Sequence, residues 1–462
     1  MGERDQSEPA EPRARSWLRF WCGPKARVFE LLVVVGLGAV FFIGAQAHNQ
    51  RFNHKATSSD QSAYLSFAKH LATRGMYVDG ARGPGYPLFL TAAYQEVATR
   101  AEFFERAKTL TVAATTLAWL TLWFLLRTRL PLLQALVAWS AIGFFGLIHY
   151  APYVKAEALY FVAITAAFLL LLRMLRSRSL KLGLACGLVL GAAYLMKSPA
   201  LFLLVAFGLA QILRLGLELL RSRAPLRDRA LAMARGVAPL AVVVLVVLGM
   251  SLPFLLENQR KYGHALYNVN SSFYLWYDNW AEAKRGTRAH GDRVGWPDLP
   301  ANELPSAHEY FATHTAPQVI ARIERGAKRS FQALGRRGVT LFLEAYALAV
   351  LFAALARRQR ALGLLKRNLP EILLFSSFLG VTVLLAAWFE PISAGPRPMA
   401  AAVPIAFAAL ALALGDLGKR KARPSSRRPG LGKVLALSIG LLLVVDVPQH
   451  LHRDFSEAIG GR

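Results

Sequence analysis

The chain has 462 residues, of which 55% are hydrophobic and only 18% are charged. Soluble domains are nearer to about 45–50% apolar and about 25% charged, so this composition excludes an ordinary soluble enzyme and a disordered chain. Uncharged runs of about 18–20 residues recur along the sequence, and a helix of that length crosses the roughly 30 Å hydrocarbon core of a bilayer. The composition therefore predicts an all-α polytopic membrane protein rather than a β-barrel.

The apolar runs predict about eleven transmembrane helices. The first is predicted to be an uncleaved signal anchor, because it is too long for a signal peptide and no clear small-residue cleavage site follows it. Pro131, Pro199 and Pro370 each open a run, which is typical of a first helical turn. The predicted spans are residues 29–48, 109–126, 132–149, 157–173, 181–196, 199–217, 237–256, 339–356, 370–389, 398–415 and 433–448.

The basic residues predict the orientation of the chain. A net charge of +27 would suit nucleic acid if the charges formed one patch. If the N-terminus lies in the cytoplasm, however, more than half of the 55 basic residues fall in short inside segments. These inside segments together contain about half as many residues as the outside segments. This positive-inside pattern explains the charge by topology and by attraction to anionic lipids. We therefore expect a multi-pass protein of the bacterial inner membrane with no nucleic-acid partner.

Alternation of the spans leaves two long segments on the external side. The chain divides into a basic cytoplasmic segment at 1–28, a transmembrane core at 29–256 with a first external loop at 49–108, a second external loop at 257–338, C-terminal transmembrane helices at 339–448 and an external tail at 449–462. The two cysteines, Cys22 and Cys186, suggest neither a disulfide framework nor a metal cluster.

Ionisable residues avoid the interiors of the predicted spans. Glu344 is the one that lies well inside a run, and it is close to the outer end. Charges at the bilayer centre are costly and mark the pathways of pumps and transporters, so their scarcity argues against ion-coupled transport. The candidate polar groups collect instead at the external face, and they are Asp60, Arg82, Glu157, Lys197, Glu257 and Arg397.

The first external loop contains a predicted helix with an aspartate in its first turn. Apolar residues at 64, 65, 68, 71 and 72 follow the helical i, i+3, i+4 spacing, and Ser58 or Ser59 is a suitable N-cap. Asp60 then has either a chemical role or the simpler role of complementing the helix dipole. The spacing alone leaves both interpretations open.

A rigid turn follows in the same loop, with the sequence Arg82-Gly83-Pro84-Gly85-Tyr86-Pro87. The Gly-Pro-Gly turn, with Pro87 opening an apolar helix, predicts a fixed return to the membrane surface. Arg82 could bind a phosphate with its planar fork of donors, or it could be an interfacial arginine on lipid headgroups.

Further candidates lie at helix ends and in the second loop. Glu157 opens a span and could simply complement the helix dipole, and Lys197 is either a snorkelling anchor or a ligand of an anionic headgroup. The segment 258–280 is rich in Tyr and Trp, which form interfacial belts but also stack on sugar rings. A helix is expected around 315–330, and Asn270-Ser271-Ser272 matches a common glycosylation sequon.

These residues together resemble those of the GT-C membrane glycosyltransferases. The similarity is carried by Asp60, by Tyr64 with the helix after it, and by Arg82 before Gly85-Tyr86-Pro87-Leu88. It continues in short matches that cover most of the chain, namely Glu157-Ala158-Leu159, Lys197-Ser198-Pro199-Ala200, Asn258 to Gly263, Trp276 to Trp280, Arg397-Pro398 and Pro404. The group looks most similar to bacterial relatives of dolichyl-phosphate-mannose–protein mannosyltransferase and of the lipid A aminoarabinose transferase.

The resemblance implies transfer of a monosaccharide from a polyprenyl-phosphate donor on the external face, with inversion at the anomeric carbon. The acceptor would be a glycan, a lipid or a protein of the cell envelope. Asp60 matches the family's first-loop acid and would be the general base, and Glu157 could supply a second acid. The resemblance assigns the donor phosphate to Arg82, Lys197 and Arg397, and the sugar or acceptor to Tyr64, Tyr86, Tyr277 and Asn279.

One position departs from the family pattern. Several relatives have an acidic residue directly after the first aspartate, but this chain has Gln61, so an arrangement of two adjacent carboxylates or a carboxylate-bound metal is not assigned. The alternative functions are a multi-pass transporter or flippase for a lipid-linked or small polar substrate, a non-catalytic scaffold, and a ligase or polymerase of surface polysaccharide. The sequence identifies neither the sugar nor the acceptor.

Overall fold

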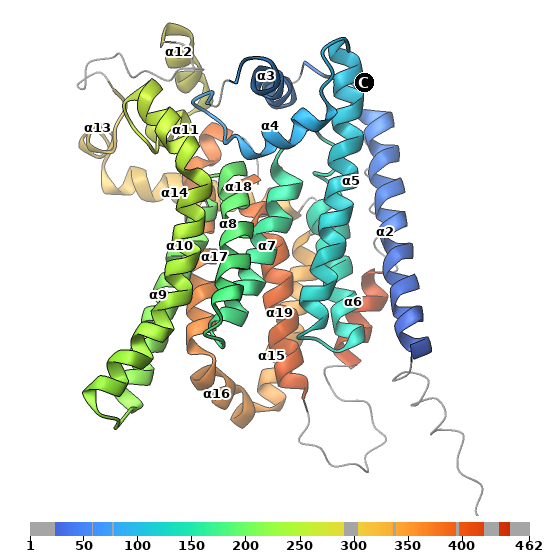
Figure 1. Ribbon diagram of the computed structural model, residues 1–462, viewed down its shortest axis with the longest axis vertical. Coiled ribbons are helices and arrows are strands. Elements are labelled where there is room, and N and C mark those ends of the chain that lie inside the picture. The colour runs from blue at the N-terminus through green and yellow to red at the C-terminus, as the bar shows by residue number, and fades with distance from the viewer. Residues whose placement is uncertain are drawn as a thin grey trace, which may run out of the picture.

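The computed structural model describes residues 24–57, 59–75, 78–290, 304–335, 339–393, 397–419 and 434–443. Within these ranges the regular elements are helices, and no strand occurs. The long helices lie side by side in one bundle, and short helices cover one of its ends (Figure 1). The predicted all-α polytopic membrane architecture is confirmed.

Each of the eleven predicted spans overlaps an apolar helix, and residues 433 and 444–448 of the last predicted span lie outside the described residues. Seven described helices are long and apolar enough to cross a membrane, and four more are apolar but shorter. The long helices are α2 (Pro24–Phe52), α5 (Arg100–Arg127), α7 (Glu157–Met174), α9 (Ala200–Arg221), α10 (Leu226–Tyr262), α15 (Val339–Ala356) and α17 (Leu369–Ser393). The shorter segments are α6 (Leu132–Ala141) with the π-helical η2 (Ile142–Leu147), α8 (Leu180–Met196), α19 (Ala402–Gly418) and Val434–Leu443.

Both long loops fold over the same end of the bundle. The first loop forms α3 (Ser59–Arg74), α4 (Gly85–Leu90) and η1 (Thr91–Ala93). The second forms α11 (Val269–Ser272), η3 (Tyr274–Trp276), α12 (Trp280–His290), α13 (Ala307–Thr313) and α14 (Ala316–Gly335). The short helix α18 (Arg397–Ala400) is not part of this loop and follows α17 in the chain. The helix expected around 315–330 is therefore confirmed. At the opposite end lie α16 (Arg358–Arg367) and the turn between α9 and α10 (Figure 1).

Glycines allow α8 and α10 to pack closely. Gly183, Gly187 and Gly191 are spaced four residues apart, so they share one face of α8. A Cβ atom at Gly187 would lie 2.7 Å from the Cβ of Val246, and one at Gly183 would lie 2.8 Å from the carbonyl oxygen of Pro239. Small residues at this spacing are typical of tight packing between transmembrane helices.

A pair of stacked tryptophans joins α5 to α6. The rings of Trp119 and Trp139 lie 3.9 Å apart with an interplanar angle of 4°. Each indole N–H donates to the other residue's backbone carbonyl, at 3.0 and 2.9 Å. Because a Cβ at Gly143 would lie 2.3 Å from the Trp119 ring, glycine at the start of η2 makes room for the stack. The polar edges of two large buried rings are thus satisfied inside the bundle.

Candidate active site

Helix α3 places Asp60 at the surface of the first loop, as predicted. Tyr64, Leu65 and Ala68 are buried against residues of α4 and α5, and this apolar face fixes the helix on the bundle. Asp60 lies in the first turn, and its side chain is 28% exposed. Its Oδ1 atom lies 3.5 Å from Nη2 of Arg82. The carboxylate is therefore accessible to a ligand and lies next to a cation.

Asp79 positions Arg82, although the sequence did not single it out. Its Oδ1 atom accepts hydrogen bonds from the backbone N–H of Ala81 at 2.9 Å and of Arg82 at 2.7 Å, which is an Asx turn. Its Oδ2 atom lies 3.4 Å from Nη1 of Arg82, and the guanidinium lies 5.6 Å from the ring centre of Tyr64. Burial opposes the charged form of Arg82, but Asp79, Tyr64 and Asp60 outweigh it and raise the pKa of the guanidinium.

The Gly-Pro-Gly turn rests on the end of α8. A Cβ atom at Gly83 would lie 2.1 Å from the backbone oxygen of Leu195, and one at Gly85 would lie 2.9 Å from the carbonyl carbon of the same residue. No other residue fits without moving the backbone, so the two glycines set the distance between α4 and α8. Lys197 is the C-cap of α8, two residues beyond Leu195. The turn therefore brings the segment of Arg82 next to the segment of Lys197.

Glu157 and Lys197 form a second ion pair near the first. Nζ of Lys197 lies 3.1 Å from Oε1 of Glu157, and the two side chains are 29% and 5% exposed respectively. Burial raises the pKa of Tyr64 well above its ordinary value; Glu157 and Asp60 add to this effect, and Arg82 opposes it. Tyr64 thus lies within the electrostatic reach of members of both pairs. Asp60, Arg82 and Glu157 all act on Tyr64, and Lys197 is linked to this group by its ion pair with Glu157.

Tyr86 lies beneath Tyr64 and is fully buried. Its hydroxyl group is 2.8 Å from Oγ1 of Thr111 on α5, and its ring meets the Tyr64 ring edge-on at 5.0 Å. Burial raises its pKa, so the phenol stays neutral. In this arrangement Tyr86 holds Tyr64 in place.

The contacts of Gln61 explain why this position carries an amide instead of a second carboxylate next to Asp60. The side chain is buried and exchanges two hydrogen bonds with the Asn53 amide, at 2.8 and 2.9 Å. Its Oε1 atom also accepts from the backbone N–H of Val154 at 2.8 Å, and its Nε2 atom donates to the carbonyl of Lys55 at 3.2 Å. A carboxylate has no donor for such bonds. Gln61 is therefore a structural amide that fixes the first turn of α3.

The second loop holds the first loop just before Arg82. The backbone N–H of Val269 donates to the carbonyl of Gly80 at 2.8 Å, and the amides of Asn268 and Asn270 donate to the carbonyl of Ala81 at 3.2 and 3.1 Å. Sequence reasoning missed these contacts, because they join residues almost 190 positions apart. The Asn270 amide of the sequon is engaged in this junction.

The predicted residues Tyr277 and Asn279 lie in the second loop on either side of Asp278, which belongs to a separate polar cluster. Asn279 caps α12, since its Oδ1 atom accepts from the backbone N–H of Glu282 at 3.0 Å and its Nδ2 atom donates to that carboxylate at 2.7 Å. Tyr277 is partly buried, and burial raises its pKa. Arg397 begins α18, but its side chain lies outside the described part of the structure.

A buried arginine organises that second cluster. Nη1 of Arg322 lies 3.2 Å from Oδ1 of Asp278 and donates to the Tyr310 hydroxyl at 2.9 Å. Its guanidinium also lies 4.6 Å from the Trp388 ring. His314 stacks on Tyr310 at 4.0 Å and bonds Oδ2 of Asp278 at 2.9 Å. Because the partners come from α13, α14 and α17, the cluster clamps the second loop onto the bundle.

The described residues do not include a group of three or more His, Cys, Asp and Glu side chains that could hold a metal ion. The polar centre around Tyr64 contains three carboxylates, those of Asp60, Asp79 and Glu157, and two cations, Arg82 and Lys197. The two cations present N–H donors that can bind an anion, and the carboxylates present acceptor oxygens.

Comparisons with known proteins give a distant structural likeness. No protein-family model and no curated protein matches the chain. Among solved structures, the archaeal oligosaccharyltransferase AglB from Archaeoglobus fulgidus, in complex with an inhibitory peptide and a dolichol-phosphate, is similar with a TM-score of 0.49 and 12% identity. The match covers 92% of this chain and 56% of that chain, so this chain spans little more than half of AglB.

Proposed function

We propose that the chain is a membrane glycosyltransferase that moves a monosaccharide from a polyprenyl-phosphate donor to an acceptor. The reaction would occur at the end of the bundle that carries α3 and α4, which the charge pattern predicts to be external. One observation carries the proposal: the partly exposed Asp60 carboxylate lies 3.5 Å from the partly exposed Arg82 guanidinium, and Glu157, the partner of Lys197, acts on the same Tyr64 as these two residues. A base and phosphate-binding cations are thus neighbours at the membrane boundary.

Asp60 is the proposed general base. An acceptor hydroxyl is a weak nucleophile at neutral pH, and a carboxylate within hydrogen-bond reach accelerates proton removal by about 10²–10⁴-fold. Asp60 suits this role because it is 28% exposed and sits on a helix fixed by a buried face. Glu157 is much less accessible, so it is better placed to hold Lys197 than to meet an acceptor.

Arg82 and Lys197 are the proposed ligands of the donor phosphate. The guanidinium presents a planar fork of donors that matches phosphate oxygens, and its Asx turn fixes the backbone beneath it. A partly exposed ion pair contributes only about 0–1 kcal/mol. A donor phosphate could therefore displace Asp60 from Arg82 at small cost and leave the carboxylate available to the acceptor.

The bond changes balance without a further reactant. The acceptor oxygen attacks the anomeric carbon from the face opposite the phosphate while its proton passes to Asp60. The bond between that carbon and the phosphate oxygen breaks, and its electron pair stays on the phosphate. Arg82 and Lys197 stabilise the charge that develops there, because preorganised cations act most strongly where charge appears in the transition state. The configuration at the anomeric carbon is inverted.

Replacing Asp60 with asparagine tests the proposal. The variant keeps the shape of the side chain but cannot accept the proton, so we expect sugar release from radiolabelled polyprenyl-phosphate donors in membranes to fall by about 10²–10⁴-fold. Asp228→Asn, on the exposed start of α10 at the other end of the bundle, is the matched control and should retain full activity. Equal rates for wild type and Asp60→Asn, at equal protein levels, would remove Asp60 from the mechanism.

A further inference from the structure

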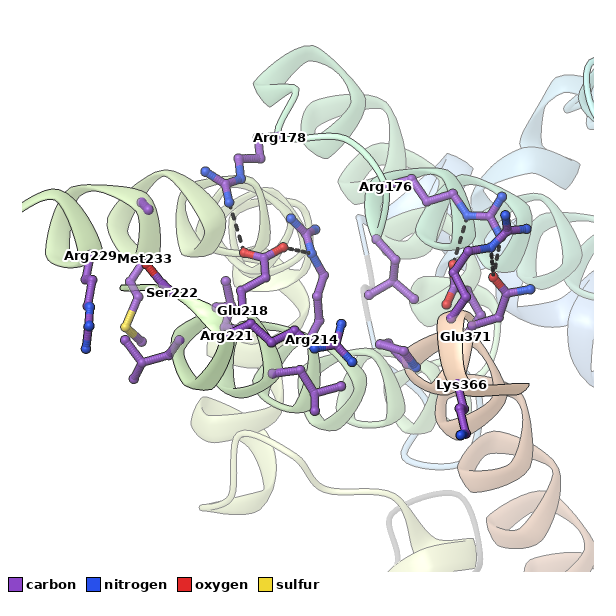
Figure 2. Close-up of a pocket in the computed structure, with 18 residues that line it drawn as sticks. Arg176, Arg178, Arg214, Glu218, Arg221, Ser222, Arg229, Met233, Lys366 and Glu371 are labelled. Carbon is purple, nitrogen blue, oxygen red and sulfur yellow. Dashed lines mark hydrogen bonds and ion pairs between the residues drawn. The ribbon is translucent and has the colours of Figure 1, made fainter. Parts of the chain in front are cut away.

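A basic cavity lies at the end of the bundle opposite Asp60. It has a volume of about 810 Å³ and lies between the end of α7, the α9–α10 turn and the junction of α16 with α17 (Figure 2). Two acidic side chains, Glu218 and Glu371, are among its walls. The basic side chains that line it are Arg176, Arg178, Arg214, Arg221, Arg229, Lys366 and Arg367.

The two carboxylates are already paired within the cavity wall. Figure 2 shows Glu218 between Arg178 and Arg214, each 2.9 Å from one of its oxygens. Glu371 lies 2.8 Å from Nε of Arg176. Four of the seven basic residues remain outside these pairs, so the cavity keeps a strong excess of positive charge. Such an excess in a concave site attracts anions.

Two buried donors in the wall have no acceptor in the described part of the protein. These are Nη1 of Arg214 and Nε of Arg229, which are both inaccessible to solvent and make no hydrogen bond to a described residue. Arg221 and Lys366 likewise make no ion pair with any described residue. Buried donors are normally satisfied, and charged ones most of all. The wall is therefore arranged for a ligand that brings acceptor oxygens.

Apolar side chains continue from the cavity onto the lipid-facing surface. Leu217, Leu219 and Met233 line the cavity itself. Leu220 beside it is 84% exposed at the end of α9. The cavity thus offers cations at the level where a span ends, and the exposed Leu209 and Ile212 precede Arg214 on α9, further toward the interior of the membrane. Basic pockets at the ends of transmembrane helices bind anionic lipid headgroups in this way.

We propose that this cavity binds the phosphate headgroup of an anionic phospholipid, whose acyl chains run along the exposed leucines of α9. A diffuse attraction of basic loops to the membrane would not require buried, unsatisfied guanidinium donors, and a soluble anion would not require the adjoining apolar wall. The site is distinct from the Asp60 site, since it lies at the other end of the bundle (Figure 1). It does not depend on the function proposed above.

The test is a titration of the delipidated, detergent-purified protein with phosphatidylglycerol or phosphatidylcholine, followed by native mass spectrometry. The cavity variant is Arg221→Gln with Arg229→Gln. Its matched control is Arg223→Gln with Arg227→Gln, which removes the same charge from exposed positions of the same turn that do not line the cavity. Lys366→Gln, on the opposite wall, is an independent second variant if the first fails to fold.

We expect wild type to bind one phosphatidylglycerol per chain with a clear preference over phosphatidylcholine. The cavity variant should lose on the order of thirty-fold in affinity, and the control less than about two-fold, because each of the two basic contacts contributes about 1 kcal/mol to binding of anionic lipid. Equal losses in both variants, or no preference for the anionic lipid, would overturn the proposal. Displacement of the lipid by millimolar inorganic phosphate alone would identify a site for free anions and would also overturn it.

Discussion

Asp60 and Gln61 are neighbours in the sequence, but their side chains lie on different sides of α3. Consecutive helical residues do not share a face, so the Asp60 carboxylate is partly exposed while the Gln61 amide is buried. Asp60 could be recognised from its helical register and from the resemblance. The role of Gln61 could not, because its partners include Val154, which is 93 residues away. A carboxylate in place of this buried amide would keep the acceptor but lose the donor.

We expect Gln61→Glu to destabilise the protein by about 1–3 kcal/mol, the cost of leaving a buried polar group unsatisfied. The substitution removes the donor that faces the Asn53 amide and the Lys55 carbonyl. The measurement is thermal unfolding of the purified protein in detergent. Gln95→Glu, at an exposed position of the same loop, makes the same change and should leave the melting temperature nearly constant. Equal melting temperatures for the two variants would contradict the assignment.

Whole helices in this protein are positioned by small residues and by polar clamps. The glycines of α8 admit α10, and the cluster around Arg322 fixes α13 and α14 against α17. The apolar runs predict that these helices exist but not which faces meet, because packing depends on neighbours far away in the sequence. The spacing of Gly183, Gly187 and Gly191 was a signal that could have revealed the α8–α10 contact.

Alanine at two helical glycines should change stability in opposite directions. At Gly187 a Cβ would lie 2.7 Å from Val246, so α10 must shift and the melting temperature should fall. At Gly208 on α9 a Cβ would meet nothing within 4 Å, so alanine should gain up to about 0.5–1 kcal/mol from helix propensity. Thermal unfolding of both variants in the same detergent checks this. A stabilised Gly187→Ala would show that the α8–α10 contact is looser than described.

The Asp278–His314 contact should make the clamp on the second loop sensitive to pH. Burial opposes the charged form of His314, but hydrogen bonds to Asp278 and to the Tyr310 carbonyl outweigh it and raise the pKa. Burial also opposes the charged form of Asp278, yet hydrogen bonds from His314 and Tyr310 lower its pKa. The contribution of His314 is thus complete below its unfolded pKa of about 6.5 and is lost as pH rises through the raised value. The contribution of Asp278 is present above about pH 4 and is lost in stronger acid.

His314→Gln should therefore lower the melting temperature most near pH 5–6, with a difference that shrinks above the raised pKa of His314. Unfolding curves of both proteins across this pH range provide the measurement. His308→Gln, at an exposed position of α13, is the matched control and should show no pH-dependent difference. A difference for His314→Gln that stays constant from pH 5 to pH 9 would show that the imidazole is not charged in this contact.

At the scale of the whole molecule, hydropathy predicted most of the fold, because each span is a local property of about 20 residues. That Asp60 and Lys197 share one site was an expectation from resemblance. The close approach of Gly83 and Gly85 to Leu195 places the turn that carries Arg82 next to the end of α8. The basic cavity escaped notice, because a count of charges by loop cannot show that Arg176, Arg229 and Lys366 line one space. The sequence thus predicts which end of the bundle is basic, but not which of the basic residues line a common cavity.

The two ends of the bundle should face different compartments, and cysteine labelling can test this. Val97, 95% exposed, lies in the first loop, and Arg223 is exposed in the α9–α10 turn. In a background with Cys22→Ser and Cys186→Ser, a membrane-impermeant maleimide should label Val97→Cys in intact cells and Arg223→Cys only after permeabilisation. The physical reason is the positive-inside rule, since the α9–α10 turn is strongly basic. The cysteine-free parent controls for background. Labelling of Arg223→Cys in intact cells, with Val97→Cys protected, would place Asp60 in the cytoplasm and contradict external transfer.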